Sequence, residues 1–168
     1  MTPEDAVALA DVQLRSYEAA QPGLRASWPA EQALDAEGMR ELLGRHRYAV
    51  LATARPDGRP QAAPVGFLVA EGAFWIGTVA GGRLRNLRAR RWASLVVMEG
   101  DPAEGSARQP HRAITVEGPV ELHENGAFAA ALARIEQRWL ERHGRSPGWA
   151  VALVELHPER VFLHASSL

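Results

Sequence analysis

The side chains with the clearest chemical potential lie in one short basic segment, residues 81–91. Five arginines occur there, and no acidic residue is present between residues 72 and 98. The five are Arg83, Arg85, Arg88, Arg90 and Arg91. A cluster of guanidinium groups without neighbouring acids favours an anionic partner, and Arg83 could bind a phosphate through two parallel hydrogen bonds.

Small residues in front of the cluster support the same interpretation. Gly81 and Gly82 allow a ligand to approach the backbone closely, and Thr78 adds a hydroxyl just upstream. If a helix begins here, its first N–H groups are unsatisfied and favour the same anion. The alternative is a solvated arginine-rich helix face that pairs with acids elsewhere in the chain.

The composition excludes several kinds of chemistry. The 168 residues include no cysteine and no lysine, so all 19 basic residues are arginine. Disulfides, thiol catalysis, iron–sulfur clusters and thiolate zinc sites are therefore excluded, as are a lysine Schiff base and a P-loop. Any anion site must use arginine, backbone N–H groups or hydroxyls.

Other functional motifs are weak or missing. The chain has no G-x-G-x-x-G, G-x-S-x-G or H-E-x-x-H motif, so dinucleotide-fold, hydrolase and zincin functions gain no support. The six histidines are scattered singly. We expect His123, His157 and His164 to be structural and predict no metal site, with a metal or haem ligand among them as the alternative.

The charge and the N-terminal region limit the partners and the location. Arginine alternates with Trp92 as in a nucleic-acid patch, but the net charge of −1 and the lack of a second basic run predict no nucleic-acid partner. The N-terminal region has neither a long apolar segment nor a basic leader. We therefore expect no membrane span and a soluble cytoplasmic protein.

Four strand-length apolar runs surround the basic segment and must position it. They are Tyr48–Ala54, Pro64–Ala70, Ala73–Gly77 and Ala93–Met98. Pro56-Asp57-Gly58 and Glu71-Gly72 supply turn residues between the first three runs. The basic segment is too polar for a strand, and its Leu84 and Leu87 share one helical face, which predicts a short helix between the third and fourth strands.

The N-terminal part of the chain predicts two helices. Thr2-Pro3-Glu4-Asp5 is typical of a helix start, and the second helix runs from Asp35 to Arg45. Between them we expect an irregular connection, residues 21–29, that holds Trp28. The face expected for the first helix contains Val7, Ala10, Leu14 and Tyr17.

The C-terminal part predicts a connection, a strand, a helix and one or two final strands. The polar connection Glu99–Pro110 is either a lid or a mobile loop. Alternation over Arg112–His123 predicts a strand that Gly118-Pro119 interrupts at a bulge or edge position. The helix ends at Gly144 and has a stripe of Phe128, Leu132, Ile135 and Trp139; Trp149–Leu156 and Val161–His164 then form one final strand or a bent pair.

Together these elements predict a mainly β fold. Six to seven mostly antiparallel strands form a β-barrel with attached helices. We expect a single domain overall, because the chain is long enough for one substantial core but not for two. Residues 1–34 form a helical extension packed on this domain, and residues 35–168 form the barrel.

The order of these motifs resembles the pyridoxamine 5′-phosphate oxidase-like family of FMN-binding split β-barrels. The shared features are a turn and strand, PDGRPQAAPVGF, a third strand, AFWIGT, and the segment GGRLRNLRARRWASLVV. The family has a segment of the type S-R-K-x-R-N-L before a strand of the type SLVV. The resemblance covers about residues 39–120 and includes the closing strand near Val161, whereas residues 1–34 lie outside it.

The resemblance implies a homodimer that binds FMN in the groove between its subunits. The deazaflavin coenzyme F-420 is the alternative cofactor, and a few members bind haem. By position, Arg83 corresponds to the phosphate-binding Lys of the family, and Arg85 and Asn86 correspond to its R-N pair. The other cofactor-binding residues that it implies are Gly77, Thr78, Gly82 and the strand residues Ala63, Pro64, Val65, Gly66 and Phe67.

The chain also departs from the family pattern. Gly81-Gly82 replaces the Ser-Arg pair, and Ala63 and Leu68 replace an Arg and a Lys of the true oxidase, so we do not expect vitamin B6 oxidation. We expect a flavin-dependent oxidoreductase that transfers hydride to or from a small organic substrate, without an assignable catalytic residue. Phe67 and Trp75 are candidates for the apolar wall of its pocket or for core packing. The alternatives are a deazaflavin-dependent reductase and a non-catalytic flavin or haem carrier or sensor.

Overall fold

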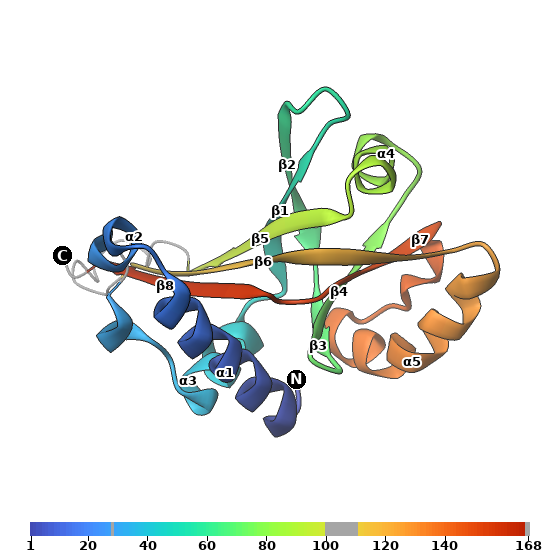
Figure 1. The fold of residues 1–168 in the computed structure, drawn as a ribbon. Coiled ribbons are helices and arrows are strands. Elements are labelled where there is room, and N and C mark those ends of the chain that lie inside the picture. Colours follow the sequence, from blue (N-terminus) through green and yellow to red (C-terminus); the bar gives the residue numbers. More distant parts are fainter. Residues whose placement is uncertain (28, 100–110, 167–168) are drawn as a thin grey trace, which may run out of the picture.

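Eight antiparallel strands form one strongly curved sheet, with helices packed around it (Figure 1). The computed structural model describes residues 1–27, 29–99 and 111–166. The strands are β1 (Tyr48–Ala54), β2 (Pro60–Gly66), β3 (Leu68–Ala70), β4 (Ala73–Thr78), β5 (Trp92–Met98), β6 (His111–Glu124), β7 (Ala152–Leu156) and β8 (Arg160–Ser166). The α-helices are α1 (Pro3–Ala19), α2 (Pro22–Ser27), α3 (Ala36–Arg45), α4 (Gly82–Ala89) and α5 (Gly126–His143), and two short 3₁₀ helices are η1 (Ala30–Gln32) and η2 (Pro147–Trp149).

This architecture confirms the predicted mainly β split barrel. The strand order is β2-β1-β5-β6-β7-β4-β3, with β8 beside β6. The predicted strand Pro64–Ala70 proves to be two strands, because the chain changes partner at Phe67: β2 pairs with β1, and β3 pairs with β4. The last two apolar runs form two strands, β7 and β8, which is the second of the two predicted alternatives. The sheet therefore has eight described strands rather than the predicted six to seven.

The long strand β6 connects the two halves of the sheet. One edge of β6 pairs with β5, and the other edge pairs first with β8 and then with β7. The exchange happens at Gly118-Pro119, where the sequence predicted an interruption; β6 instead continues unbroken. A Cβ atom on Gly118 would lie 1.9 Å from the carbonyl oxygen of His157, in the link from β7 to β8. Only glycine allows that link to cross so close to β6.

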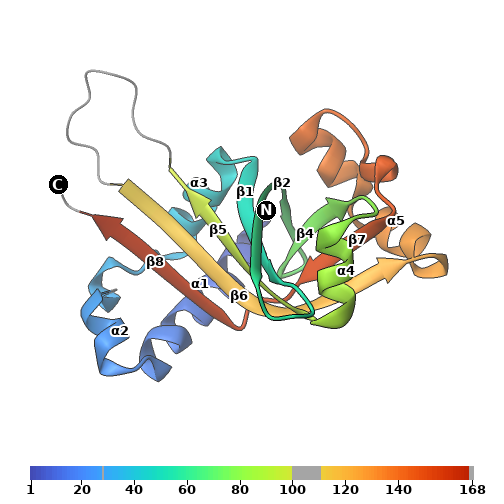
Figure 2. The same ribbon diagram turned by 90° about the horizontal axis from the view of Figure 1, so that it is seen from above.

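The predicted turns and the short basic helix are confirmed. Gly58, Glu71 and Gly72 have positive φ angles of 89°, 56° and 72°. In α4 the predicted apolar face is buried, since Leu84 and Leu87 are at most 2 % exposed. Figure 2 shows α4 beside the hairpin of β1 and β2.

Helix α5 covers the outer face of β3, β4 and β7. Ile135 and Trp139 belong to the same buried cluster as Trp75 of β4. Ala131 joins them, while Phe128 and Leu132 are partly buried against this cluster. The predicted apolar stripe therefore packs in the core. No helix among residues 1–27, 29–99 and 111–166 is long and apolar enough to cross a lipid bilayer.

The predicted face of the first helix is confirmed for Tyr17 but wrong for Val7 and Leu14. Val7 and Leu14 are 51 % and 53 % exposed, whereas the buried face includes Leu9, Gln13 and Tyr17. Gln13 is inside because its side-chain oxygen accepts a hydrogen bond from the N–H of Leu34, at 2.9 Å. Apolar periodicity does not detect a polar residue that is buried with a partner.

The connection between the first two helices is also more regular than expected. Residues 22–27 form α2 rather than an irregular segment. The interpretations of Trp28 and of most of the loop 99–110 lie outside the described residues. The helix start at Thr2 is confirmed: the Thr2 hydroxyl accepts from the Asp5 N–H at 3.2 Å, and Asp5 accepts from the Thr2 N–H at 2.9 Å.

Helix α1 covers the open edge of β8. Among the described strands β8 pairs with β6 alone, so its other edge presents backbone groups without a strand partner in this part of the chain. The Tyr17 hydroxyl accepts from the Leu163 N–H and donates to the Leu163 carbonyl, both at 3.2 Å. The Ser16 hydroxyl accepts from the Val161 N–H at 2.9 Å. Side chains of α1 thus provide hydrogen-bond partners for backbone groups of Val161 and Leu163 on the open edge of β8.

Replacing Tyr17 with Phe should destabilise the fold by about 2 kcal/mol, because two buried backbone groups of Leu163 lose their partner while the ring remains. Urea unfolding of the wild type and Tyr17→Phe measures this difference. The matched control is Leu14→Ala on the exposed face of the same helix, which should leave the unfolding midpoint nearly unchanged. Equal stability of Tyr17→Phe and wild type would contradict this role of α1.

Candidate functional site

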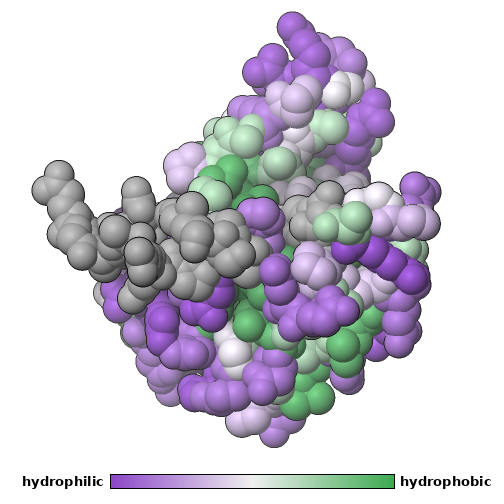
Figure 3. Space-filling view, turned by 90° about the vertical axis from the view of Figure 1, so that its left-hand side faces the viewer, coloured by the Kyte–Doolittle hydropathy of each residue, from purple (hydrophilic) through white to green (hydrophobic). Residues whose placement is uncertain are grey.

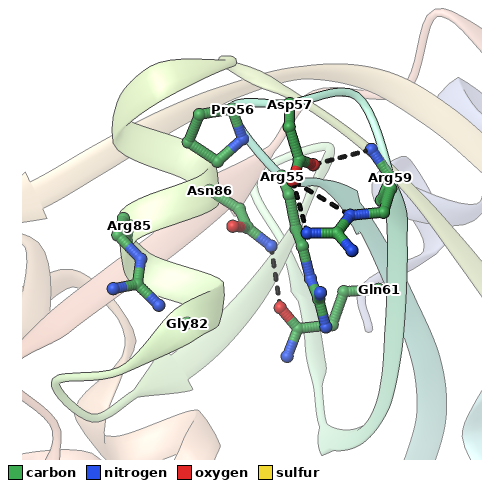
Figure 4. A pocket seen from close by; sticks show the side chains of 8 residues that line it. All are labelled: Arg55, Pro56, Asp57, Arg59, Gln61, Gly82, Arg85 and Asn86. Atoms are coloured by element: carbon green, nitrogen blue, oxygen red, sulfur yellow. Dashed lines mark hydrogen bonds and ion pairs between the residues drawn. The ribbon is translucent and has the colours of Figure 1, made fainter.

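Two adjoining pockets form a groove between the β1–β2 hairpin and the start of α4. The first, which we call the Arg83 pocket, has a volume of about 200 Å³ and is lined by Thr53, Gln61, Ala63, Thr78, Val79, Gly81, Gly82 and Arg83. The second, the hairpin pocket, has a volume of about 400 Å³ and is lined by Arg55, Pro56, Asp57, Arg59, Gln61, Gly82, Arg85 and Asn86 (Figure 4). Gln61 and Gly82 line both pockets and therefore mark their junction.

Local sequence brings the walls of the groove together. Strand β4 ends at Thr78, and the chain then passes through Gly81 into the first turn of α4. A Cβ atom on Gly82 would lie only 3.1 Å from the side-chain oxygen of Gln61 on β2. Glycine at this position therefore lets the N-terminus of α4, with its free N–H groups, approach the hairpin closely.

Arg83 is the most unusual side chain in the groove. Its Nε atom is buried and has no hydrogen-bond partner among the described residues. Burial lowers the pKa of the Arg83 guanidinium, and no acidic group offsets that effect. A buried guanidinium N–H without a partner costs free energy. An anion bound next to Arg83 would supply the missing hydrogen-bond acceptor.

The other arginines of α4 differ in their partners. Arg88 forms an ion pair with Glu124 of β6, and Arg90 donates to the carbonyl of Pro56 at 3.3 Å. Within the described parts of the chain, Arg83 and Arg85 form no ion pair. The alternative of an arginine-rich helix face that pairs with acids elsewhere in the chain is therefore correct for Arg88. It does not hold for Arg83 and Arg85, which line the groove.

Asn86 has a structural role in this arrangement. It is 1 % exposed, and its amide nitrogen donates to the hydroxyl of Thr53 at 3.0 Å and to the side-chain oxygen of Gln61 at 2.9 Å. Both donor hydrogens are thus used inside the protein, as Figure 4 shows for Gln61. Asn86 holds α4 against both strands of the hairpin and also lines the hairpin pocket, so its contact with a cofactor stays a prediction.

Only one of the four predicted residues of β2 lines the groove. Ala63 does so, but strand alternation turns Pro64 to the opposite, exposed face. Val65 shares the face of Ala63 but lies further along it, in the core, where it is 5 % exposed. Gly66 lies against the ring of His143 of α5, at 3.3 Å from a built Cβ.

Phe67 and Trp75 are core residues, which confirms core packing, one of the two roles expected for them, rather than a pocket wall. Both are 0 % exposed. The carbonyl of Phe67 already accepts from Arg142 and His143, each at 3.0 Å. Gly77 is likewise enclosed, since a Cβ atom there would lie 3.1 Å from the ring of Trp149. Of the predicted site residues, the structure therefore brings together Ala63, Thr78, Gly82, Arg83, Arg85 and Asn86.

The groove also contains residues that sequence reasoning missed. Arg55 and Arg59 flank the hairpin turn and lie next to each other, because the Arg55 N–H donates to the Arg59 carbonyl at 2.8 Å. Arg59 binds the carboxylate of Asp57, which holds the pKa of Asp57 below its usual value. The sequence could have indicated this pair, because Arg55 and Arg59 flank a predicted tight turn and a hairpin brings the residues on either side of its turn together.

The resulting charge of the groove is positive. Four arginines line it in the described structure, and the one carboxylate among the lining residues is already bound to Arg59. The four are Arg55, Arg59, Arg83 and Arg85. Since no lining residue neutralises Arg83 or Arg85, the groove is suited to an anionic ligand with more than one charge.

Comparison with known proteins identifies the family. Residues 36–165 match the family described as pyridoxamine 5′-phosphate oxidase. No curated protein matches the chain.

Solved structures show the same fold at low sequence identity. A conserved hypothetical protein from Mycobacterium tuberculosis has a TM-score of 0.65 and 22 % identity, covering 82 % of this chain and 89 % of that one. The haem storage protein HutZ from Vibrio cholerae has a TM-score of 0.59 and 20 % identity, covering 77 % and 93 %. An FAD-binding protein from Mesorhizobium loti has a TM-score of 0.59 and 22 % identity, covering 80 % and 96 %. The curled sheet, the arginine-lined groove beside α4 and the match over most of the sequence agree, and the chain belongs to the pyridoxamine 5′-phosphate oxidase family.

Proposed function

We propose that this protein is a flavin-dependent oxidoreductase that binds FMN in the groove between α4 and the β1–β2 hairpin. The observation that carries the proposal is the buried Nε of Arg83, which lacks a partner in the described structure. Its position in the first turn of α4 places it next to backbone N–H groups that are also free. Both kinds of donor favour a phosphate.

The residues of the Arg83 pocket fit the phosphate end of a flavin. Arg83 supplies the charge, and the N-terminus of α4 supplies backbone donors. Thr78 is buried, and its hydroxyl makes only a long contact, 3.4 Å, with the carbonyl of Val79. That hydroxyl can therefore turn toward a phosphate at little cost. These three kinds of donor compensate for the Ser-Arg pair that Gly81-Gly82 replaces.

A bound flavin would supply hydride transfer to or from a small organic substrate. The contribution of this chain is to hold the anionic end, to orient the substrate and to exclude water. Among the described residues that line the groove there is no histidine, cysteine or tyrosine. We therefore assign no residue of this chain as an acid, a base or a nucleophile.

The hairpin pocket favours one alternative cofactor. Arg55, Arg59 and Arg85 extend the positive charge beyond the Arg83 pocket. A deazaflavin with a long anionic tail could use this second pocket, and the related fold of an FAD-binding protein is compatible with a larger flavin. The alternative function is therefore a deazaflavin-dependent reductase.

A non-catalytic flavin or haem carrier or sensor is the second alternative. The same fold occurs in a haem storage protein. Haem iron commonly needs a histidine or another strong ligand, and none of the described residues that line the groove is a histidine. The groove thus favours a flavin over haem.

A homodimer is part of the same proposal. The outer face of β2, β1 and β5 carries apolar residues in matched rows, such as Val50 opposite Val96 and Tyr48 at the end of β1. Tyr48 and Met98 are 70 % and 56 % exposed. Figure 3 shows apolar surface at the base of the projecting hairpin, which has a hydrophilic tip. An apolar sheet face without a covering helix among the described residues is suited to a second copy of the chain.

Replacing Arg83 with Ala should weaken FMN binding by about 2 kcal/mol, the usual value of a hydrogen bond to a charged group, or roughly thirtyfold in Kd. Fluorescence titration of the purified protein with FMN measures the effect. Arg88→Ala is the matched control, because this arginine lies on the same helix but is paired with Glu124. Its Kd should remain that of the wild type.

The same titration with FAD, F-420 and haem decides between the alternatives, and turnover with a reduced flavin distinguishes an enzyme from a carrier. If the wild type binds haem but none of the flavins, the carrier function replaces the oxidoreductase. If Arg83→Ala leaves every affinity unchanged, the groove is not the cofactor site.

Arg85→Ala should separate short from long cofactors. Arg85 lines the hairpin pocket but not the Arg83 pocket. The substitution should therefore lower affinity for F-420 about tenfold, by loss of one exposed charge contact, and leave affinity for FMN nearly unchanged. Calorimetric titration of both cofactors measures the two values. An equal loss for both would show that the hairpin pocket does not hold a separate tail.

Tyr48→Asp should convert the dimer into a monomer, because it places a charge in the proposed apolar interface. Sedimentation velocity measures the mass of the wild type and the variant. Tyr48 is highly exposed in the single chain, so folding should be retained, as circular dichroism would verify. Leu140→Asp, on exposed α5, is the control and should remain dimeric. A monomeric wild type would refute the proposed interface.

A further inference from the structure

The tetrapeptide Val-Glu-Leu-His occurs twice in the chain, at residues 120–123 and 154–157. The first copy lies on β6, and the second lies on β7 and the residue that follows it. These strands are antiparallel neighbours, and their register places Glu121 directly opposite Glu155. The two copies therefore overlap in space around one pair of glutamates.

The alternation of the strands sends the Glu and His side chains to one face. Val120, Leu122, Val154 and Leu156 point into the main core or pack against it. The glutamates and histidines then face outward, on the side where α5 packs. Because the pairing is antiparallel, each histidine lies diagonally across from the glutamate of the other copy.

The distances show one compact group of potential ligands. His123 Nε2 lies 2.7 Å from a carboxylate oxygen of Glu155, and its Nδ1 lies 3.8 Å from Glu121. His157 Nε2 lies 3.9 Å from Glu155 and 4.0 Å from Glu121. One ligand atom from each of Glu121, His123 and Glu155 can be chosen so that all lie within 4.8 Å of one another.

The charges of this group are not balanced within the described structure. Two carboxylates directly opposite on adjacent strands repel each other. Arg134 of α5 approaches Glu155 at 3.3 Å, but its shorter ion pair, 2.6 Å, is to Glu71. Glu121 has no arginine partner among the described residues, and only the two histidines are near it. One further positive charge between the glutamates would remove the imbalance.

We propose that Glu121, His123 and Glu155 bind one divalent transition-metal ion of the zinc class, with His157 as the fourth ligand at the solvent side. Imidazole nitrogen and carboxylate oxygen together favour Zn²⁺ and similar ions over Mg²⁺ and Ca²⁺, which prefer oxygen ligands alone. The Glu155 and His123 side chains are only 4 % and 9 % exposed, whereas that of Glu121 is 62 % exposed and opens the site to solvent.

Neighbouring side chains hold two of the ligands in place, as the second shell of a metal site does. The ring of His123 stacks on Trp75, with ring centres 5.4 Å apart and an angle of 18° between the planes. Arg134 lies over the same Trp75 ring at 4.7 Å and donates to Glu155. No described residue of this cluster lines the groove beside α4, so the proposed site is separate from the cofactor site.

Without a metal, the direct His123–Glu155 hydrogen bond occupies the position of the ion. Zinc bonds to nitrogen and oxygen are about 2.0–2.2 Å long, so the two side chains must separate slightly when the ion enters between them. The competing explanation is a purely structural His–Glu pair beside a repelling Glu121. It predicts no saturable metal binding, and the experiment below distinguishes the two.

The experiment titrates Zn²⁺ into the purified, metal-stripped full-length protein by calorimetry and uses Co²⁺ absorption to report the ligands. We expect one ion per chain, visible-region Co²⁺ bands and no binding of Mg²⁺. Glu121→Gln removes a ligand from an exposed position without threatening the fold, and it should weaken binding at least about tenfold. Glu117→Gln, on the same strand, should bind as the wild type does.

A wild type that binds neither Zn²⁺ nor Co²⁺ would overturn the proposal. Equal affinities of Glu121→Gln and Glu117→Gln would also overturn it, because binding would then involve other histidines. The Arg83→Ala protein should keep its full metal affinity, so a failure of the flavin proposal and a failure of this one give different results.

Discussion

The close crossing of the β7–β8 link over Gly118 is the constraint on which the rest of the structure depends. A side chain there would meet the carbonyl of His157 at 1.9 Å, so only glycine lets the chain pass. The crossing allows one edge of β6 to pair with β8 and then with β7. That exchange curls the sheet and sets the register that places Glu121 opposite Glu155. The same exchange lets β7 pair with β4, and the chain passes from the end of β4 into α4.

The groove beside α4 follows from a second constraint, the use of arginine for every positive charge. An arginine stays protonated even when burial lowers its pKa, as it does for Arg83. The protein can therefore keep a partly desolvated cation next to a helix N-terminus without losing the charge. Asn86 fixes the geometry by joining α4 to Thr53 and Gln61. Walls joined by these hydrogen bonds, and a buried guanidinium N–H that has no partner within the described structure, favour the binding of an anion with little reorganisation.

Sequence reasoning recovered the elements of the fold better than it recovered the side-chain roles. Strand alternation, turn residues and the two α4 leucines are local signals, and they predicted the strands and the basic helix. Gln13 and Asn86 could not be placed, because their burial depends on partners more than twenty residues away. The same limit explains Phe67: an aromatic residue after a strand fits a pocket or a core equally well until α5 is seen to cover it.

The net charge of the chain is −1, but the structure has a local excess of positive charge in one region and of negative charge in another. In the described structure, arginines outnumber carboxylates among the residues that line the groove beside α4, while carboxylates exceed nearby arginines around Glu121 on the α5 side of the sheet. A total charge near zero therefore excludes an extended electrostatic footprint but not local sites of either sign. The surpluses do not cancel directly, because the sheet and its core lie between the two faces. Asn86 fixes the backbone that carries the groove arginines, and His123 is hydrogen-bonded to Glu155, so moving α4 or Glu155 to neutralise either surplus would break those hydrogen bonds. An external anion in the groove would leave the Asn86 hydrogen bonds intact, whereas a metal ion beside Glu121 would exchange the His123–Glu155 hydrogen bond for bonds to the metal.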